Sequence, residues 1–313
     1  MKVLVTGGAG FIGSNLVWTL LNGWHEVHVV DDLSTGRFEN LHPAAMMRTL
    51  DITSERFPDA VAEICPEAIV HLAAQTSVPA SVQDPERDRL VNVEGTRAVA
   101  RAAKACGVSR VVSASSAAVY GNPSELPLPE TAAKRPANPY GRSKLEAEAV
   151  LAAELRGSGV DFASLRFSNV YGPRQDWRGE GGVVAIFAAA MSSGRPPVVF
   201  GSGAQTRDFI YVGDVVSAIL AALEQPSPLA GEGEDGPAYN ISTGTETSID
   251  MLIAHLRAAT RYGGPVEHAP AREGDIERSA LDPSKARSVL GWQARVPLET
   301  GLGMTVQWFA RSQ

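Results

Sequence analysis

The chain has 313 residues, 44% of them hydrophobic, which is enough to bury the core of one large domain or of two closely joined domains. Its formal net charge of −7, without a basic run, argues against a nucleic-acid partner or an anionic membrane surface. The two cysteines, Cys65 and Cys106, lack CxxC spacing, so we predict neither a disulfide framework nor a thiolate metal site.

The N-terminus begins with a strand pattern, and no apolar run reaches the roughly 20 residues that span a bilayer. We therefore expect a cytoplasmic protein. The six histidines show neither HxxxH nor HExxH spacing, so we expect no bound metal ion.

Short β-branched runs alternate with longer amphipathic stretches through the first half of the chain. Strands are predicted at 2–6, 26–31, 47–52, 67–73, 109–115 and 161–170, and helices at 11–22, 87–107 and from 139 onward. Such alternation is typical of βαβ units around a parallel sheet that is buried on both faces. We predict an α/β, doubly wound Rossmann fold.

The pattern loosens after residue 167, where a helix at 183–191, a strand at 198–201 and a polar loop at 226–238 are predicted. We expect a Rossmann domain over 1–167 and a smaller α/β portion, mainly substrate-binding, over 168–313. Residues 212–225 of the second portion are expected to pack back on the Rossmann domain.

The motif TGGAGFIG places Gly7, Gly10 and Gly13 between the first strand and the first helix. Glycines allow the tight turn and a close approach to a pyrophosphate, and the helix N-terminus supplies N–H donors and a positive dipole. Asp31 follows 18 residues after Gly13, where a ribose-binding acid belongs. The motif therefore predicts a dinucleotide site.

An acid at the end of the second strand bears on the choice of cofactor. Asp31 would accept hydrogen bonds from the adenosine ribose and repel a 2′-phosphate, so we predict NAD rather than NADP. Arg37, the nearby cation, is interpreted as a solvated loop residue. Asp32 is adjacent, so position alone leaves open which carboxylate binds the ribose.

The segment NPYGRSKLEAEAV places Tyr140 and Lys144 one helical turn apart, directly after Pro139. Proline suits the first turn of a helix, and the residues that follow are strong helix formers. The two side chains are therefore predicted on one face. Taken alone, YxxxK describes an exposed aromatic and a solvated lysine more often than a catalytic pair.

Seven motifs occur in order along the chain: TGGAGFIG, Asp31, DIT at 51–53, HLAA at 71–74, NVEGT at 92–96, SSAAVYG at 115–121 and YGRSK at 140–144. Together they resemble the extended short-chain dehydrogenases/reductases and, within these, the UDP-glucose (UDP-galactose) 4-epimerases and their nucleotide-sugar relatives. RFSNVYGPRQ, TRDFIYVGDV and REGD extend the resemblance over nearly the whole chain.

The resemblance implies a catalytic role for three residues. Tyr140 is the acid/base, and Lys144 lowers its pKa and bonds the nicotinamide ribose. Ser116 hydrogen-bonds the sugar 4-hydroxyl and Tyr140. Without the resemblance, Ser116 would be interpreted as a serine in a turn at the end of a strand.

The resemblance also implies which residues bind each ligand. NAD is expected to contact Gly7, Gly10, Phe11, Ile12, Gly13, Asp31, Asp51, Ile52, Leu72, Ala73, Ala74, Asn92, Tyr140 and Lys144. The UDP-sugar is expected to contact Ser116, Tyr140, Asn169, Val183, Val198, Phe200, Arg207, Arg272, Asp275 and Ser279. Gln75 and Thr76 depart from the family pattern, which puts one cofactor contact in doubt. Taken singly, each arginine also fits a surface salt bridge.

The residues after Ser116 favour epimerization. Relatives that dehydrate or decarboxylate nucleotide sugars carry an acid there, whereas this chain has Ala117 and Ala118. Without a second proton-transfer group, a transient 4-keto sugar can mainly be reduced again. We expect interconversion of UDP-glucose and UDP-galactose. In the 4-epimerases that the chain resembles, a bulky tyrosine at the position of Ser279 is associated with exclusion of N-acetylated sugars. Because serine is smaller, we also expect N-acetylated UDP-sugars as substrates.

Two other hypotheses stay open at this stage. A UDP-glucuronate 4-epimerase, or another NAD-dependent nucleotide-sugar-modifying enzyme such as a reductase, fits the same motifs. A noncatalytic NAD-binding scaffold or nucleic-acid-associated relative is disfavoured because Ser116, Tyr140 and Lys144 are all present.

The resemblance further implies a homodimer, because in the family the helices matching 87–107 and the Tyr140 helix form an intersubunit four-helix bundle. Both carry small residues that allow close helix packing: Gly95, Ala98, Ala102, Ala149 and Ala152. The same residues would equally fit burial against the sheet.

Overall fold

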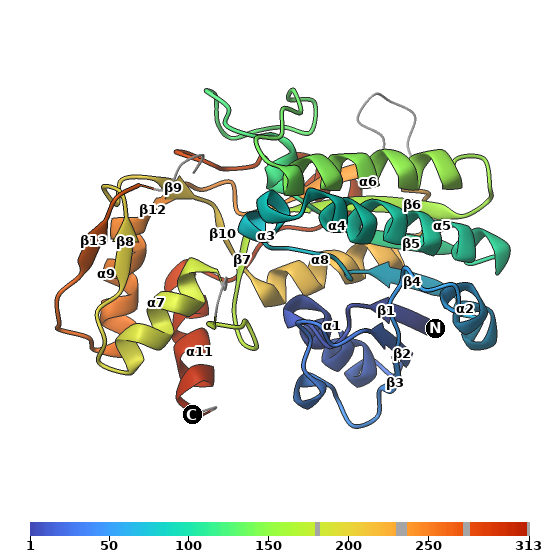
Figure 1. Cartoon of the computed structure of the whole chain (residues 1–313), viewed down its shortest axis with the longest axis horizontal. Helices are drawn as coiled ribbons and strands as arrows, with labels where there is room; N and C mark the ends of the chain where they lie inside the picture. The colour runs from blue at the N-terminus through green and yellow to red at the C-terminus, as the bar shows by residue number, and fades with distance from the viewer. Residues whose placement is uncertain (179–181, 230–236, 272–275, 312–313) are drawn as a thin grey trace.

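A seven-stranded parallel sheet lies at the centre of the larger part of the molecule in this computed structural model (Figure 1). The structure describes residues 1–178, 182–229, 237–271 and 276–311. In sheet order the strands are β11 (Ala238–Ile241), β6 (Asp161–Phe167), β5 (Arg110–Ser116), β4 (Ala68–His71), β1 (Lys2–Thr6), β2 (Glu26–Asp31) and β3 (Met46–Thr49). The predicted doubly wound fold is confirmed.

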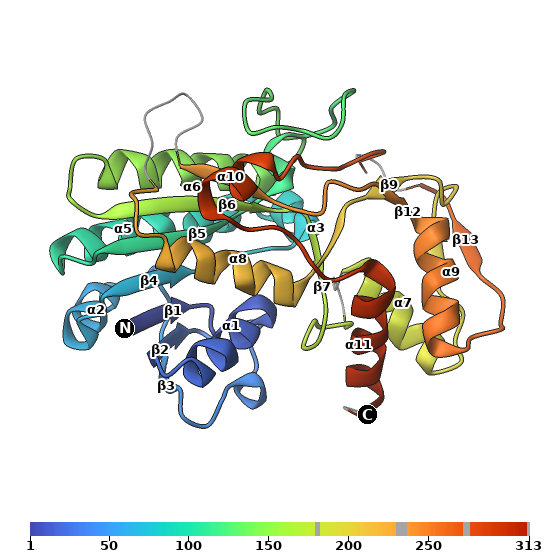
Figure 2. The ribbon, with the colours of Figure 1, turned by 180° about the vertical axis from the view of Figure 1, so that it is seen from behind.

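Helices cover both faces of this sheet, as seen from behind in Figure 2. One face carries α1 (Phe11–Asn22), α8 (Val212–Glu224) and α10 (Ser284–Leu290), and the other carries α2 (Phe57–Ile64), α5 (Gly95–Ala105) and α6 (Pro139–Leu155). The strands are apolar on both sides because a hydrophobic cluster fills each of the two layers.

The predicted helix at 87–107 is a succession of shorter segments. It consists of α4 (Pro85–Arg89), a π-helical segment η2 (Leu90–Glu94) and α5, and it is preceded by α3 (Val78–Gln83). The Asp84 side chain caps α4 by accepting from the Arg87 amide. A π-helical turn changes the direction in which side chains project, and here it contains Asn92.

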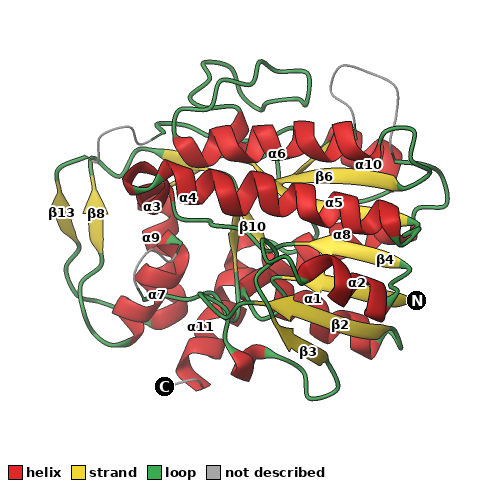
Figure 3. Cartoon of the chain, turned by 45° about the vertical axis from the view of Figure 1, so that its right-hand side comes forward, coloured by secondary structure: helices red, strands yellow, loops and turns green. Residues whose placement is uncertain are grey.

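The smaller part of the chain, whose helices lie beside the sheet in Figure 3, has its own hydrophobic core. Its helices are α7 (Val183–Ser192), α9 (Ile249–Thr260) and α11 (Leu298–Arg311). Three two-stranded pairings border them: β7 (Asn169–Tyr171) with β10 (Phe209–Tyr211), β9 (Thr206–Arg207) with β12 (Thr247–Ser248), and β8 (Val198–Phe200) with β13 (Glu267–Ala269). Short 3₁₀ turns, η1 (Phe38–Asn40) and η3 (Ala117–Val119), complete the description.

The chain returns to the sheet more than once after residue 167. Helix α8 packs in the core layer with α1, β11 extends the sheet beside β6, and α10 lies in the same layer. Residues 212–225 therefore lie against the Rossmann sheet, whereas the strand at 238–241 was not anticipated there. The division at residue 167 stays a prediction, because the later segment supplies both a strand and two helices to the first.

The small residues of α5 and α6 that the dimer prediction named differ in their exposure within the chain. Gly95 and Ala102 are buried within the chain, and Ala98 and Ala152 pack partly buried against the core cluster. Ala149 is exposed. Gly95, Ala98, Ala102 and Ala152 therefore pack within the chain, as the alternative of burial against the sheet expects, and the homodimer stays a prediction. Among the described residues, no helix is both long and apolar enough to cross a membrane.

Candidate active site

The glycine-rich loop joins β1 to α1 at the carboxyl edge of the sheet. Gly7 adopts a φ of +70°, and a Cβ there would lie 2.5 Å from the Ala73 backbone nitrogen. A Cβ on Gly13 would lie 2.1 Å from the carbonyl oxygen of Gly7. Only glycines fit both positions, and α1 begins here with its amide groups toward the loop. The loop therefore fits the diphosphate of a dinucleotide.

Asp31 faces this loop and Asp32 does not. Asp31 is 6% exposed, and its carboxylate accepts hydrogen bonds from the amides of Ala9 and Leu33, each at 2.9 Å. Burial raises the pKa of Asp31, and the two amide hydrogen bonds oppose that shift. Asp32 is exposed and bonds to Ser34. The position of Asp31 supports the choice of carboxylate that the sequence left open.

The remaining predicted cofactor residues follow the neighbouring strands. Leu72, Ala73 and Ala74 leave the end of β4, where the Leu72 amide donates to the Thr6 carbonyl. Asp51 is exposed and bonds to Thr53. Phe11 and Ile12 open α1, partly buried, while Ile52 is buried beneath Gly95. The structure thus brings these segments to one edge of the sheet.

Tyr140, Lys144 and Ser116 meet where β5 ends and α6 begins. Asn138 caps α6 by accepting from the Gly141 amide at 2.8 Å, which places Tyr140 in the first turn as predicted. The Tyr140 hydroxyl shares a hydrogen bond with the Ser116 side chain. Lys144 Nζ lies 6.0 Å from the centroid of the Tyr140 ring.

Lys144 is only 6% exposed, and its ammonium donates to the Ala114 carbonyl at 3.2 Å. Burial lowers the pKa of Lys144 to about 8, and the charges of Asp88 and Glu148 oppose this shift. The pKa of Tyr140 is raised by burial, lowered by the hydrogen bond with Ser116, and raised further by Asp88. Removal of the phenol from water dominates this shift, and the lowering of the Tyr140 pKa by Lys144 stays an expectation for the enzyme with NAD bound.

Two buried polar residues near this site, Asp88 and His71, were given no role from the sequence. Asp88 lies on α4, which packs against α6, and Gln75 donates to it. His71 bridges Thr6 and Thr96 through its two ring nitrogens, and burial lowers the pKa of His71 to about 3. In the sequence, the one sign that His71 is buried is its position at the end of an apolar strand. Asp88 lies in the charged run ERDR, and such a run is typical of a solvent-exposed turn, so the sequence does not indicate its burial.

Gln75 was noted only as a departure from the family pattern. Its side-chain amide donates to the Ser77 carbonyl at 2.9 Å and to Asp88 Oδ1 at 2.8 Å. This side chain is therefore committed to contacts within the protein. A cofactor contact by Gln75 is not supported.

On the substrate side, Asp208 joins the segments that carry Asn169, Arg207 and Ser279. Its carboxylate is fully buried and accepts from Thr243, Gly244 and Leu281, all within 3.4 Å. The Asn169 amide donates to the Asp208 carbonyl, and the Thr206 amide donates to the Glu277 carbonyl. These backbone bonds bring the three predicted substrate residues to one region.

The other predicted substrate residues are less closely grouped. Val198 and Phe200 lie on β8, with Val198 exposed and Phe200 partly buried. Val183 begins α7 and packs partly buried against the smaller core. Arg272 and Asp275 lie outside the described residues. No group of side chains suited to hold a metal ion occurs within residues 1–178, 182–229, 237–271 and 276–311.

Comparison with known proteins agrees with this geometry. Residues 3–242 match the NAD dependent epimerase/dehydratase family. A UDP-glucose 4-epimerase of Mycolicibacterium smegmatis is 44% identical over 99% of this chain and 98% of its own length.

Two solved structures are also similar to the chain. The Thermotoga maritima UDP-glucose 4-epimerase with UDP-glucose has a TM-score of 0.93 at 40% identity, covering 100% of this chain and 99% of that one. The UDP-N-acetylglucosamine 4-epimerase of Methanobrevibacter ruminantium, in complex with UDP-N-acetylmuramic acid, has a TM-score of 0.92 at 31% identity, with the same coverage.

A Rossmann sheet, a glycine loop with its acid, and a Ser–Tyr–Lys group at the strand ends define an NAD-dependent enzyme of the extended short-chain dehydrogenase/reductase class. The chain belongs to the NAD dependent epimerase/dehydratase family. The resemblance inferred from the motifs is therefore confirmed, together with NAD as the cofactor and nucleotide-sugar epimerization as the reaction type.

Proposed function

We propose that the chain interconverts UDP-glucose and UDP-galactose by inverting carbon 4 of the sugar. The observation that carries this proposal is the contact between Ser116 and Tyr140, with Lys144 one turn further along α6. The similar proteins named UDP-glucose 4-epimerase support the choice of substrate.

Each residue of this group has a defined task. Tyr140 accepts the proton of the sugar 4-hydroxyl and later returns it, while Ser116 holds that hydroxyl in line. Lys144, as an ammonium, favours the phenolate by its charge. The glycine loop and Asp31 hold NAD, which supplies the reversible oxidation of a secondary alcohol.

The η3 turn explains why the reaction stops at inversion. Ala117 and Ala118 follow Ser116 directly and offer no group that can move a second proton. The 4-keto sugar can therefore only be reduced again, on either face, while Tyr140 holds the proton. No net redox change results, so the enzyme needs no stoichiometric oxidant.

We also propose that N-acetylated UDP-sugars are substrates. Ser279 carries a small side chain, and its neighbour Arg278 is held in an ion pair with Glu246. The similarity to a UDP-N-acetylglucosamine 4-epimerase supports this extension. A UDP-glucuronate 4-epimerase is the alternative, because the chemistry at carbon 4 is the same.

Purified protein incubated with five UDP-sugars, without added cofactor, separates these proposals. The panel is UDP-glucose, UDP-galactose, the two N-acetylated forms and UDP-glucuronate. We expect 4-epimers of the first four, and preferential turnover of the uronate would favour the alternative. A protein that requires added reduced cofactor would be a reductase.

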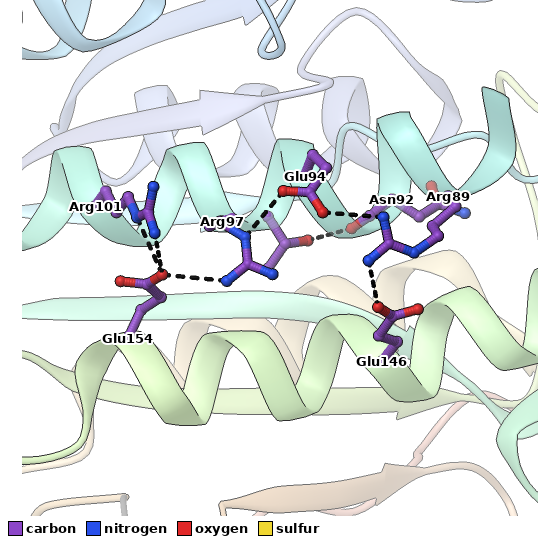
Figure 4. Close-up of polar contacts among 8 residues, drawn as sticks. Arg89, Asn92, Glu94, Arg97, Arg101, Glu146 and Glu154 are labelled. Atoms are coloured by element: carbon purple, nitrogen blue, oxygen red, sulfur yellow. Dashed lines mark hydrogen bonds and ion pairs between the residues drawn. The ribbon is translucent and has the colours of Figure 1, made fainter. Parts of the chain in front are cut away.

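We further propose a cytoplasmic homodimer formed through α5, α6 and their neighbours. Arg89 of α4 pairs with Glu146 of α6, and Arg97 of α5 pairs with Glu154 of α6, so ion pairs join α4 and α5 to α6 (Figure 4). Val82 and Leu90, 61% and 50% exposed, add apolar area beside it. Sedimentation at micromolar concentration should give a dimer, and a monomer would contradict this proposal. Cell fractionation tests the location.

A further inference from the structure

Asp88 is a buried carboxylate on α4, which packs against the helix α6 that carries Tyr140 and Lys144. It is 1% exposed, although its neighbours in the PERDR segment face solvent. One oxygen, Oδ1, accepts from Gln75 Nε2 at 2.8 Å and from Asn92 Nδ2 at 3.3 Å. Among the described residues, no donor lies within hydrogen-bond distance of the other oxygen, Oδ2. A buried acceptor without a partner is costly, and such groups are retained where they serve a purpose.

The network around Asp88 reaches the backbone of the catalytic tyrosine. Asn92 Nδ2 also donates to Ser143 Oγ at 3.0 Å, and Ser143 Oγ donates to the Tyr140 carbonyl at 3.0 Å. On the other side, the Tyr140 amide donates to Ser81 Oγ at 3.1 Å. The first turn of α6 is thus held in register with α3, α4 and η2 by buried polar contacts.

The charge of Asp88 is uncompensated, unlike that of the other nearby acid. Glu148 also lies on the Lys144 side of α6, but it forms a two-pronged ion pair with Arg166, with distances of 2.9 and 2.7 Å. Asp88 has no cationic side chain within ion-pair distance in the described part of the chain. The charge of Asp88 raises the pKa of both Lys144 and Tyr140.

We propose that Asp88 is a positioning residue for the reaction, a buried negative charge that keeps Lys144 in its ammonium form behind Tyr140. This inference rests on the proposed function, since it assigns Asp88 a task in the same proton transfer. Burial alone drives Lys144 toward its neutral form, and Asp88 opposes that tendency. The cost is that the same charge disfavours the phenolate. The two effects set the range of pH in which the ammonium and the phenolate coexist.

The other charged or titratable groups around the pair do not supply this charge. His71 faces Lys144 from β4 and is neutral because burial lowers its pKa to about 3. Glu148 is paired, as described above, and Ser116 is neutral. We therefore expect that removal of the Asp88 charge shifts the pH range in which the enzyme is active.

Asp88→Asn tests the proposal, because the amide keeps the shape and the Oδ1 acceptor but removes the charge. Asp84→Asn is the matched control, since it removes an exposed carboxylate one turn earlier and keeps its capping oxygen. Asp88→Glu keeps the charge. Two readouts are taken: kcat/KM from pH 5.5 to 10, and the ultraviolet titration of the Tyr140 phenolate continued to pH 12, because burial raises the pKa of Tyr140. Subtraction of the matching Tyr140→Phe protein isolates this phenolate.

In Asp88→Asn both limbs of the kcat/KM profile should move to lower pH, because phenolate formation and loss of the lysine proton both become easier. The phenolate titration should move in the same direction, and Asp84→Asn should match the wild type in both readouts. A rate lowered equally at every pH, with an unmoved titration, would overturn the proposal. So would a chain that folds only with a carboxylate at position 88, since the charge would then serve stability. If no nucleotide sugar is turned over at all, the proposed function fails while the titration still tests Asp88.

Discussion

The Asp31 carboxylate accepts a hydrogen bond of 2.9 Å from the backbone amide of Ala9, within the glycine-rich loop. This contact connects the end of β2 to the turn between β1 and α1, 22 residues apart. It holds a negative charge beside the place where the loop fits a diphosphate. The carboxylate therefore stabilises the loop, and we expect it to repel a phosphate on the adenosine ribose.

We expect Asp31→Ala to weaken NAD binding and to reduce the preference for NAD over NADP, because both the ribose acceptor and the repelling charge are lost. Asp32→Ala is the control, since Asp32 is exposed and bonds only to Ser34. Titration of each protein with both dinucleotides measures the ratio of dissociation constants. An unchanged ratio in Asp31→Ala, with a changed ratio in the control, would reassign the role to Asp32.

Tyr140→Phe should reduce turnover by a factor of about 10² to 10⁴ while NAD stays bound, because the change removes only the proton acceptor. Tyr262→Phe is a matched control at a surface tyrosine that bonds to the Pro265 carbonyl. Steady-state rates and cofactor content are measured on both proteins. Near-normal turnover in Tyr140→Phe would remove Tyr140 from the mechanism.

His71 should make the fold sensitive to acid. Because burial lowers its pKa to about 3, the folded chain keeps this imidazole neutral, whereas the unfolded chain binds a proton below the ordinary value of 6.5. Above pH 6.5, His71 is neutral in both states and does not reduce the free energy of unfolding. As the pH falls from 6.5 toward 3, protonation of the unfolded chain lowers the free energy of unfolding. At 1.4 kcal/mol per unit, the loss between pH 6.5 and 5 is about 2 kcal/mol.

Urea unfolding at pH 7.5 and pH 5 measures this term. The wild type should lose about 2 kcal/mol more than His71→Gln, which keeps hydrogen-bonding capacity toward Thr6 and Thr96 but does not titrate. His268→Gln, at an exposed position, should behave as the wild type. Equal losses in wild type and His71→Gln would show that His71 does not carry the acid sensitivity.

Ser279→Tyr should suppress turnover of UDP-N-acetylglucosamine while sparing UDP-glucose, because the phenol ring takes up the volume needed by the N-acetyl group. Ser279→Ala is the control, since it removes the hydroxyl without adding volume. Competition between the two substrates gives the ratio of kcat/KM values. Equal loss of both in Ser279→Tyr, or no N-acetylated turnover in the parent, would show that Ser279 is not the gate.

The order of the first six strands, and the helices α1, α6 and α7, were predictable because period and turn signals are local properties. The same holds for Tyr140 and Lys144, whose spacing on a helix puts them on one face. The role of β11 was not predictable, since its four residues AYNI acquire a place in the sheet only by pairing with β6. That pairing depends on contacts far along the chain.

Asp88 shows why part of the site escaped prediction. In the sequence it lies between arginines, and such a segment ordinarily forms a solvated face. Its burial accompanies hydrogen bonds from Gln75 and Asn92. Gln75 is distant in the sequence, and Asn92 lies in the π-helical segment η2. Likewise, the pKa of Tyr140 depends on how much water the folded chain removes, which no spacing encodes.

The most direct test of the central claim uses purified protein without added cofactor. One reaction starts from UDP-glucose and another from UDP-galactose, and the amounts of both sugars are followed over time. We expect both starting sugars to reach the same equilibrium mixture, at a rate that Tyr140→Phe abolishes, with no net accumulation of reduced cofactor. Failure of either sugar to convert, or conversion that consumes stoichiometric NAD, would contradict the assignment as a 4-epimerase.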